Sequence, residues 1–559
     1  MKLEDVIRTI TITDRRGHFD AEIRTITSDS RRVGEGDVFV AVRGREIDGH
    51  DFIPDALRRG ARAVVAEDWP EELDDGLGHR PNVILVEDTR RALAVSAAHV
   101  FGDPSKDLQV AGVTGTNGKT TVAHVLEAIL AGAGKQTGVI GTTGARYPGK
   151  VVPLQHTTPD PVTMQGLLAR MHLDGVTHVV MEVSSHALDQ QRVRGVHLKV
   201  AGFTNLTQDH LDYHGDMERY FAAKARLFTE VLAGSAARGR MAVVNIDDPR
   251  GPELIELWGG KALTVSLSDT NADLHVSEVE YGLSGTRAVV ESDKGAFDVE
   301  VALIGAHNLS NVLVAIGMAE AMGLPPSRAV TGLTQLGPAP GRLEPVPSDE
   351  GKRVFVDYAH TPDALEQVLA SLRPLVSSRL IVVFGCGGDR DAEKRPLMGK
   401  AVAQAADLAV VTSDNPRNED PAEIATSVET GLKEAGWSRI GTVPAPRTFQ
   451  TELDRRRAIE VAIGWMEPGD VLVIAGKGHE QTQTMKGVSV PFDDREEARR
   501  VLADLPPAPP PPPSPPPDVE GTQVIESIDI EPDVVEVGER SGPAQLVADD
   551  DVEREDDES

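Results

Sequence analysis

Short apolar runs that end in small polar residues alternate along this chain with stretches of helical periodicity. In the first part of the chain the apolar runs are residues 37–42, 61–67 and 82–87, and residues 53–60 fit a short helix between the first two. Alternation of short strands with helices is typical of an α/β domain. We therefore predict an α/β domain over residues 1–107.

Residues 108–340 repeat this alternation around a second set of apolar runs. The runs lie at 110–113, 177–183, 200–203 and 241–245, and each leads into polar residues. In an open parallel sheet, ligands bind beyond the carboxyl ends of the strands, which is where such polar clusters fall. The pattern predicts a central domain with a binding site along one edge of its sheet.

Residues 341–505 contain further strands with polar clusters at their ends, separated by helical segments. The strands are predicted at 353–357, 380–385, 408–412 and 471–475. This order is typical of a doubly wound, Rossmann-like sheet whose loops gather on one edge. The glycine-rich fragments here are weak evidence for a dinucleotide, and no acidic residue is suitably placed, so we reject NAD as a ligand.

The segment 506–559 differs from the rest of the chain. Residues 506–517 include 10 prolines, and the whole segment carries 16 acidic residues against 2 arginines. Such a composition favours polyproline II followed by an acidic, disordered tail. A solvating appendage is the preferred interpretation, and an arm that binds an unknown partner is the alternative.

Composition narrows the functional classes. The net charge of −31 over 559 residues argues against a broad nucleic-acid footprint. The single cysteine, Cys386, excludes an internal disulfide framework, as expected in a reducing cytoplasm. No signal peptide is recognisable, and no apolar run reaches the roughly 18–20 residues of a membrane span. We expect a soluble, cytoplasmic protein without a membrane span.

The most informative stretch is LQVAGVTGTNGKTT at residues 108–121. An apolar run, a glycine-rich loop and the start of an amphipathic helix form the context of a phosphate-binding loop, although Val113 stands where the common consensus has glycine. A glycine-rich turn with a chance lysine is the plain alternative, and the flanking strand and helix argue against it. The predicted ATP contacts are Gly115, Thr116, Asn117, Gly118, Lys119, Thr120 and Thr121.

Two residues near other strand ends are candidate ligands of Mg²⁺ or substrate. Glu182 lies next to the end of the run 177–183, and His210 lies in the polar cluster after 200–203. Taken alone, Glu182 is better explained by an ion pair and His210 by the start of a helix. A phosphate loop strengthens the ligand interpretation, because Mg²⁺ accompanies ATP and prefers oxygen ligands.

Ten motifs in order resemble those of the Mur ligases, the cytoplasmic ATP-dependent amino-acid ligases of peptidoglycan synthesis. The resemblance covers about residues 20 to 500 and includes the variant Val113. Besides TGTNGKTT, the motifs are EVSSHALDQQR (182–192), TNLTQDHLDYHG (204–215), AAK ending at Lys224, GAHNLSN (305–311), GRLE (341–344), DYAHTPDAL (357–365), GCGGDRDAEKRPLM (385–398), DNPR (414–417) and GKGHE (476–480).

The resemblance implies a chemistry of carboxylate activation. ATP with Mg²⁺ phosphorylates a substrate carboxylate to an acyl phosphate, which an amine then attacks. Lys119 would bind the γ-phosphate, Thr120 and Glu182 would hold one Mg²⁺, and His210 would hold a second. Lys224 matches the family's carbamoylated lysine, since only the carbamate has oxygens that can ligate a metal.

The resemblance also assigns binding residues in each domain. Asn308, Arg342 and Asp357 would contact the ATP nucleotide. The uridine nucleotide would contact Ser28 and Ser30 of the first domain. The muramoyl-dipeptide part of the same substrate would contact Thr157, Thr158, Ser184, Gln190 and Arg192.

Within the family, the HLDYHG and DNPR forms resemble the members that add meso-2,6-diaminopimelate to UDP-N-acetylmuramoyl-L-alanyl-D-glutamate. Diaminopimelate is lysine with an extra distal carboxylate, and a guanidinium pairs with a carboxylate in a bidentate manner. Loss of one such contact costs roughly 1.5–3 kcal/mol. The residues that would bind diaminopimelate are Arg390, Asp414, Asn415, Pro416, Arg417, Gly476 and Glu480.

Three alternatives remain at this point. The same ligase acting on L-lysine would leave Arg417 without a carboxylate. A folylpolyglutamate synthase-like ligase would share the loop but would have no use for a uridine-nucleotide domain. An ATP-gated scaffold that binds partners through its tail is disfavoured by the intact set of Lys119, Glu182, His210 and Lys224. Three domains around one cleft also imply closure around the substrates.

Overall fold

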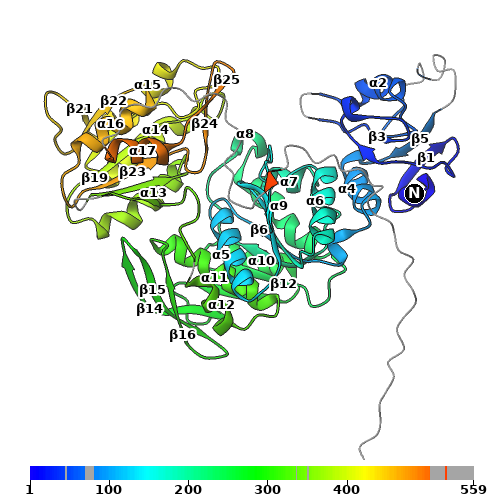
Figure 1. The fold of residues 1–559 in the computed structure, drawn as a ribbon, viewed down its shortest axis with the longest axis horizontal. Coiled ribbons are helices and arrows are strands. Elements are labelled where there is room, and N and C mark those ends of the chain that lie inside the picture. Colours follow the sequence, from blue (N-terminus) through cyan, green and yellow to red (C-terminus); the bar gives the residue numbers. More distant parts are fainter. Residues whose placement is uncertain are drawn as a thin grey trace, which may run out of the picture.

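The computed structural model describes residues 1–44, 47–69, 73, 81–334, 336–348, 352–503 and 523–524. Three β-sheets, each covered by helices, follow one another along the chain (Figure 1). This confirms the predicted class of three α/β domains, while the exact boundaries at 107, 340 and 505 stay predictions. The predicted acidic tail lies outside the described residues except for β26 (Gln523–Val524), which pairs in parallel with β9.

The first sheet has five strands in the order β1-β5-β4-β3-β2, and only β1 runs antiparallel to its neighbour. The predicted strands and the predicted helix are all present, shortened by a few residues. The strands are β1 (Ile12–Arg16), β2 (Ile26–Thr27), β3 (Val38–Val40), β4 (Ala63–Ala66) and β5 (Asn82–Val86), and the helices are α1 (Leu3–Ile7), α2 (Ile53–Arg58) and α4 (Thr89–Val100).

The central sheet has twelve strands in the order β16-β15-β14-β13-β12-β11-β6-β10-β7-β8-β9-β26. Strands β14 to β7 in this order are parallel, and antiparallel strands flank them. Its strands are β6 (Gln109–Thr114), β7 (Thr137–Gly141), β8 (Gly144–Tyr147), β9 (Lys150–Val152), β10 (His178–Glu182), β11 (Leu198–Phe203), β12 (Met241–Asn245), β13 (Ala262–Ser266), β14 (Leu274–Gly282), β15 (Gly285–Ser292) and β16 (Phe297–Val301).

Helices cover both faces of the central sheet because its parallel strands are apolar on both sides. One face packs on α5, α11 and α12, and the other packs on α6, α7, α9 and α10. The bounds are α5 (Lys119–Gly132), α6 (Pro161–Leu173), α7 (Ser185–Asp189), α8 (Leu211–His214), α9 (Met217–Arg226), α10 (Arg250–Trp258), α11 (Ala306–Ala321) and α12 (Pro326–Leu333).

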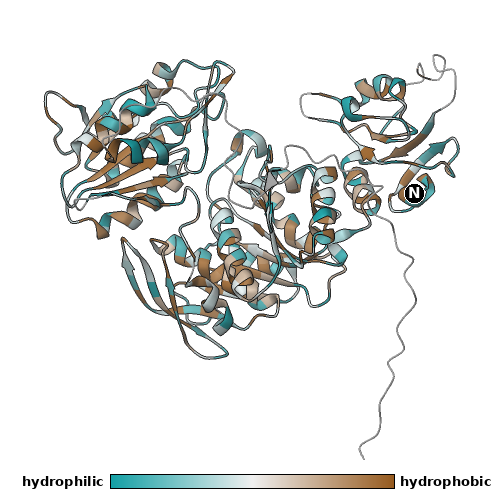
Figure 2. Cartoon of the chain, viewed as in Figure 1, coloured by the Kyte–Doolittle hydropathy of each residue, from teal (hydrophilic) through white to brown (hydrophobic). Residues whose placement is uncertain are grey.

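The third sheet has seven strands in the order β17-β18-β23-β19-β20-β22-β21, parallel except for β17, with helices on both faces. Figure 2 shows apolar strands beneath helices with polar outer surfaces. The strands are β17 (Glu344–Val346), β18 (Arg353–Asp357), β19 (Leu380–Phe384), β20 (Leu408–Val411), β21 (Ser438–Arg439), β22 (Thr448–Thr451) and β23 (Val471–Ala475). The helices are α13 (Pro362–Leu372), α14 (Lys394–Ala405), α15 (Pro421–Glu434), α16 (Arg455–Trp465) and α17 (Asp494–Leu502), and a separate hairpin holds β24 (Thr482–Met485) and β25 (Val488–Pro491).

Candidate active site

The phosphate-binding loop joins the end of β6 to the start of α5. Gly118 precedes the helix with a φ of 88°, and a Cβ atom there would lie 2.1 Å from Oδ1 of Asn311. A Cβ atom on Gly115 would lie 1.8 Å from Oγ1 of Thr204. Only glycine fits such positions. The first N–H groups of α5 have no partner within the helix, which suits an anion at this terminus.

The side chains of Thr116, Asn117 and Thr121 in the same loop make different contacts. The hydroxyl of Thr116 lies 3.2 Å from the hydroxyl of Tyr220. The amide of Asn117 donates to Oδ2 of Asp363 at 2.8 Å, which joins the loop to the first turn of α13 in the third domain. Thr121 is buried in the first turn of α5. Of these three, Asn117 reaches across to a neighbouring domain.

Two lysines converge on one carbonyl of the loop. Lys119 Nζ donates to the carbonyl oxygens of Gly115 and Thr116, both at 2.9 Å. Lys224 Nζ, which is fully buried, donates to the same Gly115 oxygen at 2.7 Å and lies 4.4 Å from the ring centre of Tyr220. Burial lowers the pKa of both ammonium groups, and repulsion from Lys119 lowers the pKa of Lys224 further. Lys119 therefore lies at the loop as a donor for phosphate oxygens, with Lys224 buried behind the same carbonyl.

Glu182 lies at the end of β10, beside the end of β6, and its side chain is buried. Oε2 accepts from the hydroxyls of Thr120 (2.8 Å) and Thr142 (3.0 Å), and Oε1 accepts from the backbone N–H of Thr142 (2.9 Å). Sequence reasoning missed Thr142, although it follows the apolar strand β7 as the other site residues follow theirs. The carboxylate is therefore held rigidly beside the phosphate loop.

A chain of hydroxyls continues outward from Glu182. The hydroxyls of Thr142 and Thr157 lie 3.2 Å apart. Thr158 Oγ1 donates to the carbonyl of Glu182 at 2.9 Å and accepts from the N–H of Ser184 at 3.0 Å, while Ser184 caps α7. Of the residues predicted to bind the muramoyl-dipeptide, Thr158 thus bonds to Glu182 directly, and Thr157 and Ser184 are linked to it through Thr142 and Thr158.

Arg192 and Gln190 extend the same surface. The Arg192 guanidinium donates to Oε1 of Gln190 (2.7 and 3.1 Å) and to the carbonyl of Thr158 (2.8 Å). Gln190 donates to the hydroxyl of Tyr213 at 3.2 Å, and that hydroxyl donates to Asp189 at 2.8 Å. This network fixes the orientation of a half-buried arginine beside the hydroxyl chain, as an anionic substrate group requires.

His210 precedes the short helix α8 with a φ of 54°. Its Nε2 lies 3.3 Å from Oδ2 of Asp209, and its ring meets the edge of His186 at 4.7 Å between ring centres. Desolvation lowers the pKa of His210, so the imidazole is neutral at pH 7 and suited to bind a metal.

The donor set fits one Mg²⁺ better than two. Thr120 and Glu182 provide the oxygen ligands that Mg²⁺ prefers, with nucleotide oxygens and water to complete the set. Lys224 as an ammonium group has no lone pair to offer, so it fits a second metal only after carbamoylation. Across the residues that the structure describes, no group of three or more histidine, cysteine, aspartate and glutamate side chains is placed to hold a metal.

The three predicted nucleotide contacts outside the loop differ in whether their polar atoms already have hydrogen-bond partners within the protein. The Arg342 guanidinium lies 4.8 Å from the ring centre of Tyr358, and its buried Nε has no hydrogen-bond partner. Both carboxylate oxygens of Asp357 accept backbone N–H groups at 2.7 Å, from residues 343 and 359. Asn308 donates to the carbonyl of Ile304 at 2.9 Å. Arg342 thus has an unpaired N–H group that can bind an anion. The side chains of Asp357 and Asn308 instead bond to the backbone of neighbouring residues.

The loops after β20 and β23 meet in the third domain. Asn415 donates to Oε2 of Glu480 at 2.9 Å, and the fully buried Lys477 donates to the same oxygen at 2.8 Å. Asp414 Oδ1, also buried, has no hydrogen-bond partner. Gly476 begins this loop with a φ of 118°. Sequence reasoning singled out four of these five residues and missed Lys477, although it lies within GKGHE.

Arg417 projects from the same loop. Its backbone is left-handed, with a φ of 53°, and Nη1 donates to the carbonyl of Gly388 at 2.6 Å. The carbonyl of Pro416 lies so close to Gly388 that a Cβ atom there would approach it to 2.0 Å. Arg390 is exposed two residues farther on. The loops after β19 and β20 therefore hold Arg417 in place and leave Arg390 at the surface.

The first domain holds its two predicted residues on the turn after β2. Ser30 is buried at the start of a single 3-10 turn, and Ser28 is half-buried. Between them, Asp29 pairs in a bidentate manner with Arg31 at 2.8 and 2.9 Å, which lowers the pKa of Asp29. The turn is locally rigid, as a nucleotide contact requires.

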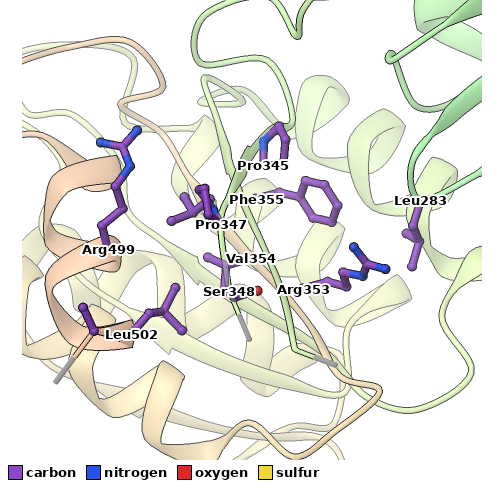
Figure 3. A pocket seen from close by; sticks show the side chains of 11 residues that line it. Leu283, Pro345, Pro347, Ser348, Arg353, Val354, Phe355, Arg499 and Leu502 are labelled. Carbon is purple, nitrogen blue, oxygen red and sulfur yellow. The ribbon is translucent and has the colours of Figure 1, made fainter. Parts of the chain in front are cut away.

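A cavity of about 490 Å³ lies apart from these residues, between β17, β18 and the end of α17 (Figure 3). Pro345, Phe355 and Leu502 line it together with Arg353 and Arg499. No predicted site residue lines it, so it is separate from the candidate active site. Within the described residues, no helix combines the length and apolar character that a bilayer crossing requires.

Comparison with known proteins identifies the family. Three Mur ligase domains match in order: the "Mur ligase family, catalytic domain" at residues 22–101, the "Mur ligase middle domain" at 113–319 and the "Mur ligase, glutamate ligase domain" at 341–478. The UDP-N-acetylmuramoyl-L-alanyl-D-glutamate–2,6-diaminopimelate ligase of Geobacter metallireducens is 42% identical, with 90% of this chain and 99% of the relative covered. The ligase of the same name from Synechococcus elongatus is 42% identical over 89% of this chain and 97% of its own.

Solved structures agree with these relatives. A structure of UDP-N-acetylmuramoyl-L-alanyl-D-glutamate–2,6-diaminopimelate ligase matches 90% of this chain and 99% of its own, at 34% identity and a TM-score of 0.64. A folylpolyglutamate synthase of Mycobacterium tuberculosis shares the fold over 69% of this chain and 91% of its own, at 21% identity and a TM-score of 0.55. The long match to the ligases, together with the loop and strand-end residues described above, shows that this chain belongs to the Mur ligase family.

Proposed function

We propose that this protein is the ATP-dependent ligase that adds meso-2,6-diaminopimelate to UDP-N-acetylmuramoyl-L-alanyl-D-glutamate in peptidoglycan synthesis. Relatives about 40% identical over most of the chain carry that name. The third domain places Asp414, Asn415 and Glu480 together, and Arg417 projects from the same loop. This pairing of a carboxylate cluster with a guanidinium carries the proposal, since diaminopimelate has both ammonium groups and a distal carboxylate.

The reaction joins a carboxylate to an amine. The γ-carboxylate oxygen of the D-glutamyl residue attacks the γ-phosphorus of ATP, and ADP leaves. The amine then attacks the acyl carbon, phosphate leaves, and the proton of the amine passes to solvent. Lys119 and Arg342 offset the negative charge of the transferred phosphoryl group. Mg²⁺, held by Thr120 and Glu182, would supply further charge neutralisation when bound.

Carbamoylation of Lys224 is part of the proposal. The neutral amine is the form that reacts with CO₂, and burial beside Lys119 favours that form, since the pKa of Lys224 lies well below its usual value. The resulting carbamate would turn a cation into an anion with two oxygens. With His210, it would complete a second Mg²⁺ site.

The parts of the nucleotide-linked substrate bind to different domains. The uridine nucleotide binds at Ser28 and Ser30, and the dipeptide extends to the surface of Thr157, Thr158 and Arg192. We place this reaction in the cytoplasm, where ATP and the nucleotide-linked precursor occur together. Neither a nucleic acid nor a metal other than Mg²⁺ is needed.

A panel of amino acids tests the proposed function. Phosphate release from ATP is measured with the UDP-muramoyl-dipeptide and with meso-diaminopimelate, L-lysine or no amine. We expect release with diaminopimelate and little with L-lysine. Arg417→Ala should lower kcat/KM for diaminopimelate about 10- to 100-fold, because a charge-assisted bond is worth roughly 1.5–3 kcal/mol.

Two matched variants sharpen this test. Arg417→Lys keeps the charge but loses the planar fork, and we expect it to recover only part of the activity. Arg390→Ala removes an exposed arginine close in sequence to Gly388 and should have a smaller effect. Equal turnover of diaminopimelate and L-lysine by the wild type would contradict the proposed specificity.

A further inference from the structure

The hairpin of β24 and β25 has no role in the scheme above. It forms a two-stranded sheet of its own, separate from the seven-stranded sheet of the third domain (Figure 1). Lys486 (φ 50°) and Gly487 (φ 74°) make its turn, and two consecutive left-handed residues are typical of a tight hairpin. An isolated parallel bridge joins Met485 of β24 to Arg417. The hairpin therefore lies against the loop after β20, which carries Arg417.

Backbone hydrogen bonds from β24 and its turn hold Arg417 on both sides. The N–H of Arg417 donates to the carbonyl of Thr484 at 3.1 Å, and the carbonyl of Arg417 accepts from the N–H of Lys486 at 2.5 Å. The left-handed backbone of Arg417, with a φ of 53°, is unfavourable for a residue that has a Cβ atom. The two bonds offset that cost, so the backbone conformation from which the Arg417 side chain projects depends on the hairpin.

One side chain of β24 adds to these backbone bonds. Gln483 is only 6% exposed, and its Nε2 donates to the backbone carbonyl of Asp414 at 2.8 Å. The N–H of Thr484 donates to Oδ1 of Asn415 at 3.0 Å. A buried amide group needs hydrogen-bond partners within the protein, and the partner of Gln483 is the first residue of the loop. The hairpin thus holds residues 414–417 at both ends.

The far end of the Arg417 side chain is held by another loop. Nη1 donates to the carbonyl of Gly388 at 2.6 Å, and the N–H of Gly388 donates to the carbonyl of Asn415 at 2.9 Å. The hairpin therefore fixes the backbone of Arg417, and the loop after β19 supports its guanidinium. A bidentate bond between a guanidinium and a carboxylate needs a defined geometry, so it is sensitive to a displacement of either end.

We propose that β24 is a specificity element for the amino-acid substrate and that Gln483 is its positioning residue: it holds residues 414–417 so that the Arg417 guanidinium meets the distal carboxylate. The inference rests on the proposed function and adds an element that lies outside the motifs used to predict the site, since GKGHE ends at Glu480. Displacement of the loop weakens the binding of diaminopimelate. L-lysine has no carboxylate at that end and is far less sensitive.

A double-mutant cycle in the full-length protein tests the inference. Methionine is about as long as glutamine but has no N–H donor. We expect Gln483→Met to lower kcat/KM for diaminopimelate about 3- to 10-fold, while the KM values for ATP and the UDP-muramoyl-dipeptide change less than about twofold. In the Arg417→Ala background, Gln483→Met should change kcat/KM less than about twofold, because Gln483 acts through Arg417. Equal losses in the two backgrounds would overturn the inference.

Gln404→Met is the matched control. Gln404 is exposed near the C-terminal end of α14 in the same domain, so this variant makes the same change of side chain away from the hairpin. It should keep kcat/KM for diaminopimelate within about twofold of the wild type in both backgrounds.

Hydrogen–deuterium exchange tests the same contact without substrate. In Gln483→Met, the amides of residues 414–418 should exchange about tenfold faster than in the wild type, because the loop has lost a bond that closes it. The amides of α16 in the same domain should keep their exchange rates. Faster exchange in both segments would show that Gln483 stabilises the domain as a whole, and unchanged exchange in 414–418 would show that it does not hold the loop. Either result contradicts the inference.

Failure of the proposed function has a different signature. It appears in the wild type alone, as absent turnover with diaminopimelate, and the specificity role of β24 then falls with it. A wild type that uses diaminopimelate, combined with equal losses from Gln483→Met in the two backgrounds, overturns the inference alone.

Discussion

At the scale of single residues, the candidate active site depends on buried charges whose partners lie on other strands. Glu182 is the clearest case, because its carboxylate accepts from Thr120 and Thr142, which follow β6 and β7. A buried carboxylate that loses a donor is left partly unsatisfied. The position of Glu182 therefore depends on Thr142 as well as on the predicted ligand Thr120.

We predict that Thr142→Val lowers kcat about tenfold. Valine has the shape of threonine but cannot donate to Oε2, and one lost bond to a charged group costs roughly 1.5–3 kcal/mol. Initial rates at varied Mg²⁺ and ATP measure the effect, and we expect a weaker apparent affinity for Mg²⁺. Thr426→Val, which removes an exposed hydroxyl from α15, is the control. Unchanged rates in Thr142→Val would show that this donor is dispensable.

At the scale of elements, the parallel strands explain why the functional residues lie where they do. β6, β10 and β11 are neighbours, so the residues after each strand converge on the phosphate loop. In the third domain, β20 and β23 flank β19, and the loops after them bring Asn415 and Glu480 into contact. The start of α5 tolerates little change, because Gly118 is both left-handed and packed against Asn311.

We predict that Gly118→Ala abolishes measurable ATP binding and lowers thermal stability. The substitution adds left-handed strain of roughly 1–2 kcal/mol and a Cβ atom 2.1 Å from Oδ1 of Asn311. Gly134→Ala is a matched control, since Gly134 follows α5 with a φ of 75° and a Cβ atom there would have no neighbour within 4 Å. It carries the strain without the clash, so it should lose some stability and keep ATP binding. Calorimetry with an ATP analogue separates the two outcomes.

At the scale of the whole molecule, one polar contact between the central and third domains lies beside the phosphate loop. Oδ2 of Asp363, on the first turn of α13, accepts from Asn117 and Thr207 of the central domain, both at 2.8 Å. The third domain is thereby tied to the ATP site by a few hydrogen bonds. His307 of the central domain also lies 2.9 Å from the hydroxyl of Ser371, and Ile304 packs on the third-domain core, so Asp363 is one of several contacts between these two domains.

We predict that Asp363→Ala weakens this link between domains. X-ray scattering of the unliganded variant should give a larger radius of gyration than the wild type, and the KM for ATP should rise about tenfold as Asn117 loses its partner. Gln367→Ala is the control, because Gln367 donates to the same oxygen from within α13 at 3.0 Å and leaves the contact between domains in place. In the wild type, ATP analogue and substrate together should make the molecule more compact. Identical scattering of Asp363→Ala and wild type would contradict the proposed tether.

Local patterns predicted much of the architecture and many of the residues that carry the chemistry. The parallel strands were predictable because buried strands are continuous apolar runs, and β18 and β23 begin and end at the predicted residues. The antiparallel strands β14–β16 were missed, since their half-exposed pattern is weaker. The apolar periodicity of the helix begins at Val122, but α5 begins three residues earlier at Lys119, because its first turn belongs to the loop. Thr142 and Lys477 were missed for a related reason, as neither is unusual until its partner is known.

The sequence by itself determined the fold class, the phosphate loop and the family, because these depend on local periodicity and on motifs read in order. Only the tertiary structure decided that Lys119 and Lys224 share the Gly115 carbonyl, that Thr142 holds Glu182, and that Lys477 lies buried between Asn415 and Glu480. Burial and charge pairing arise from contacts between residues far apart in the chain, and these contacts set the pKa values of the site. The phosphate loop at residues 108–121 is thus predictable from its sequence, but its electrostatic surroundings are a property of the folded molecule.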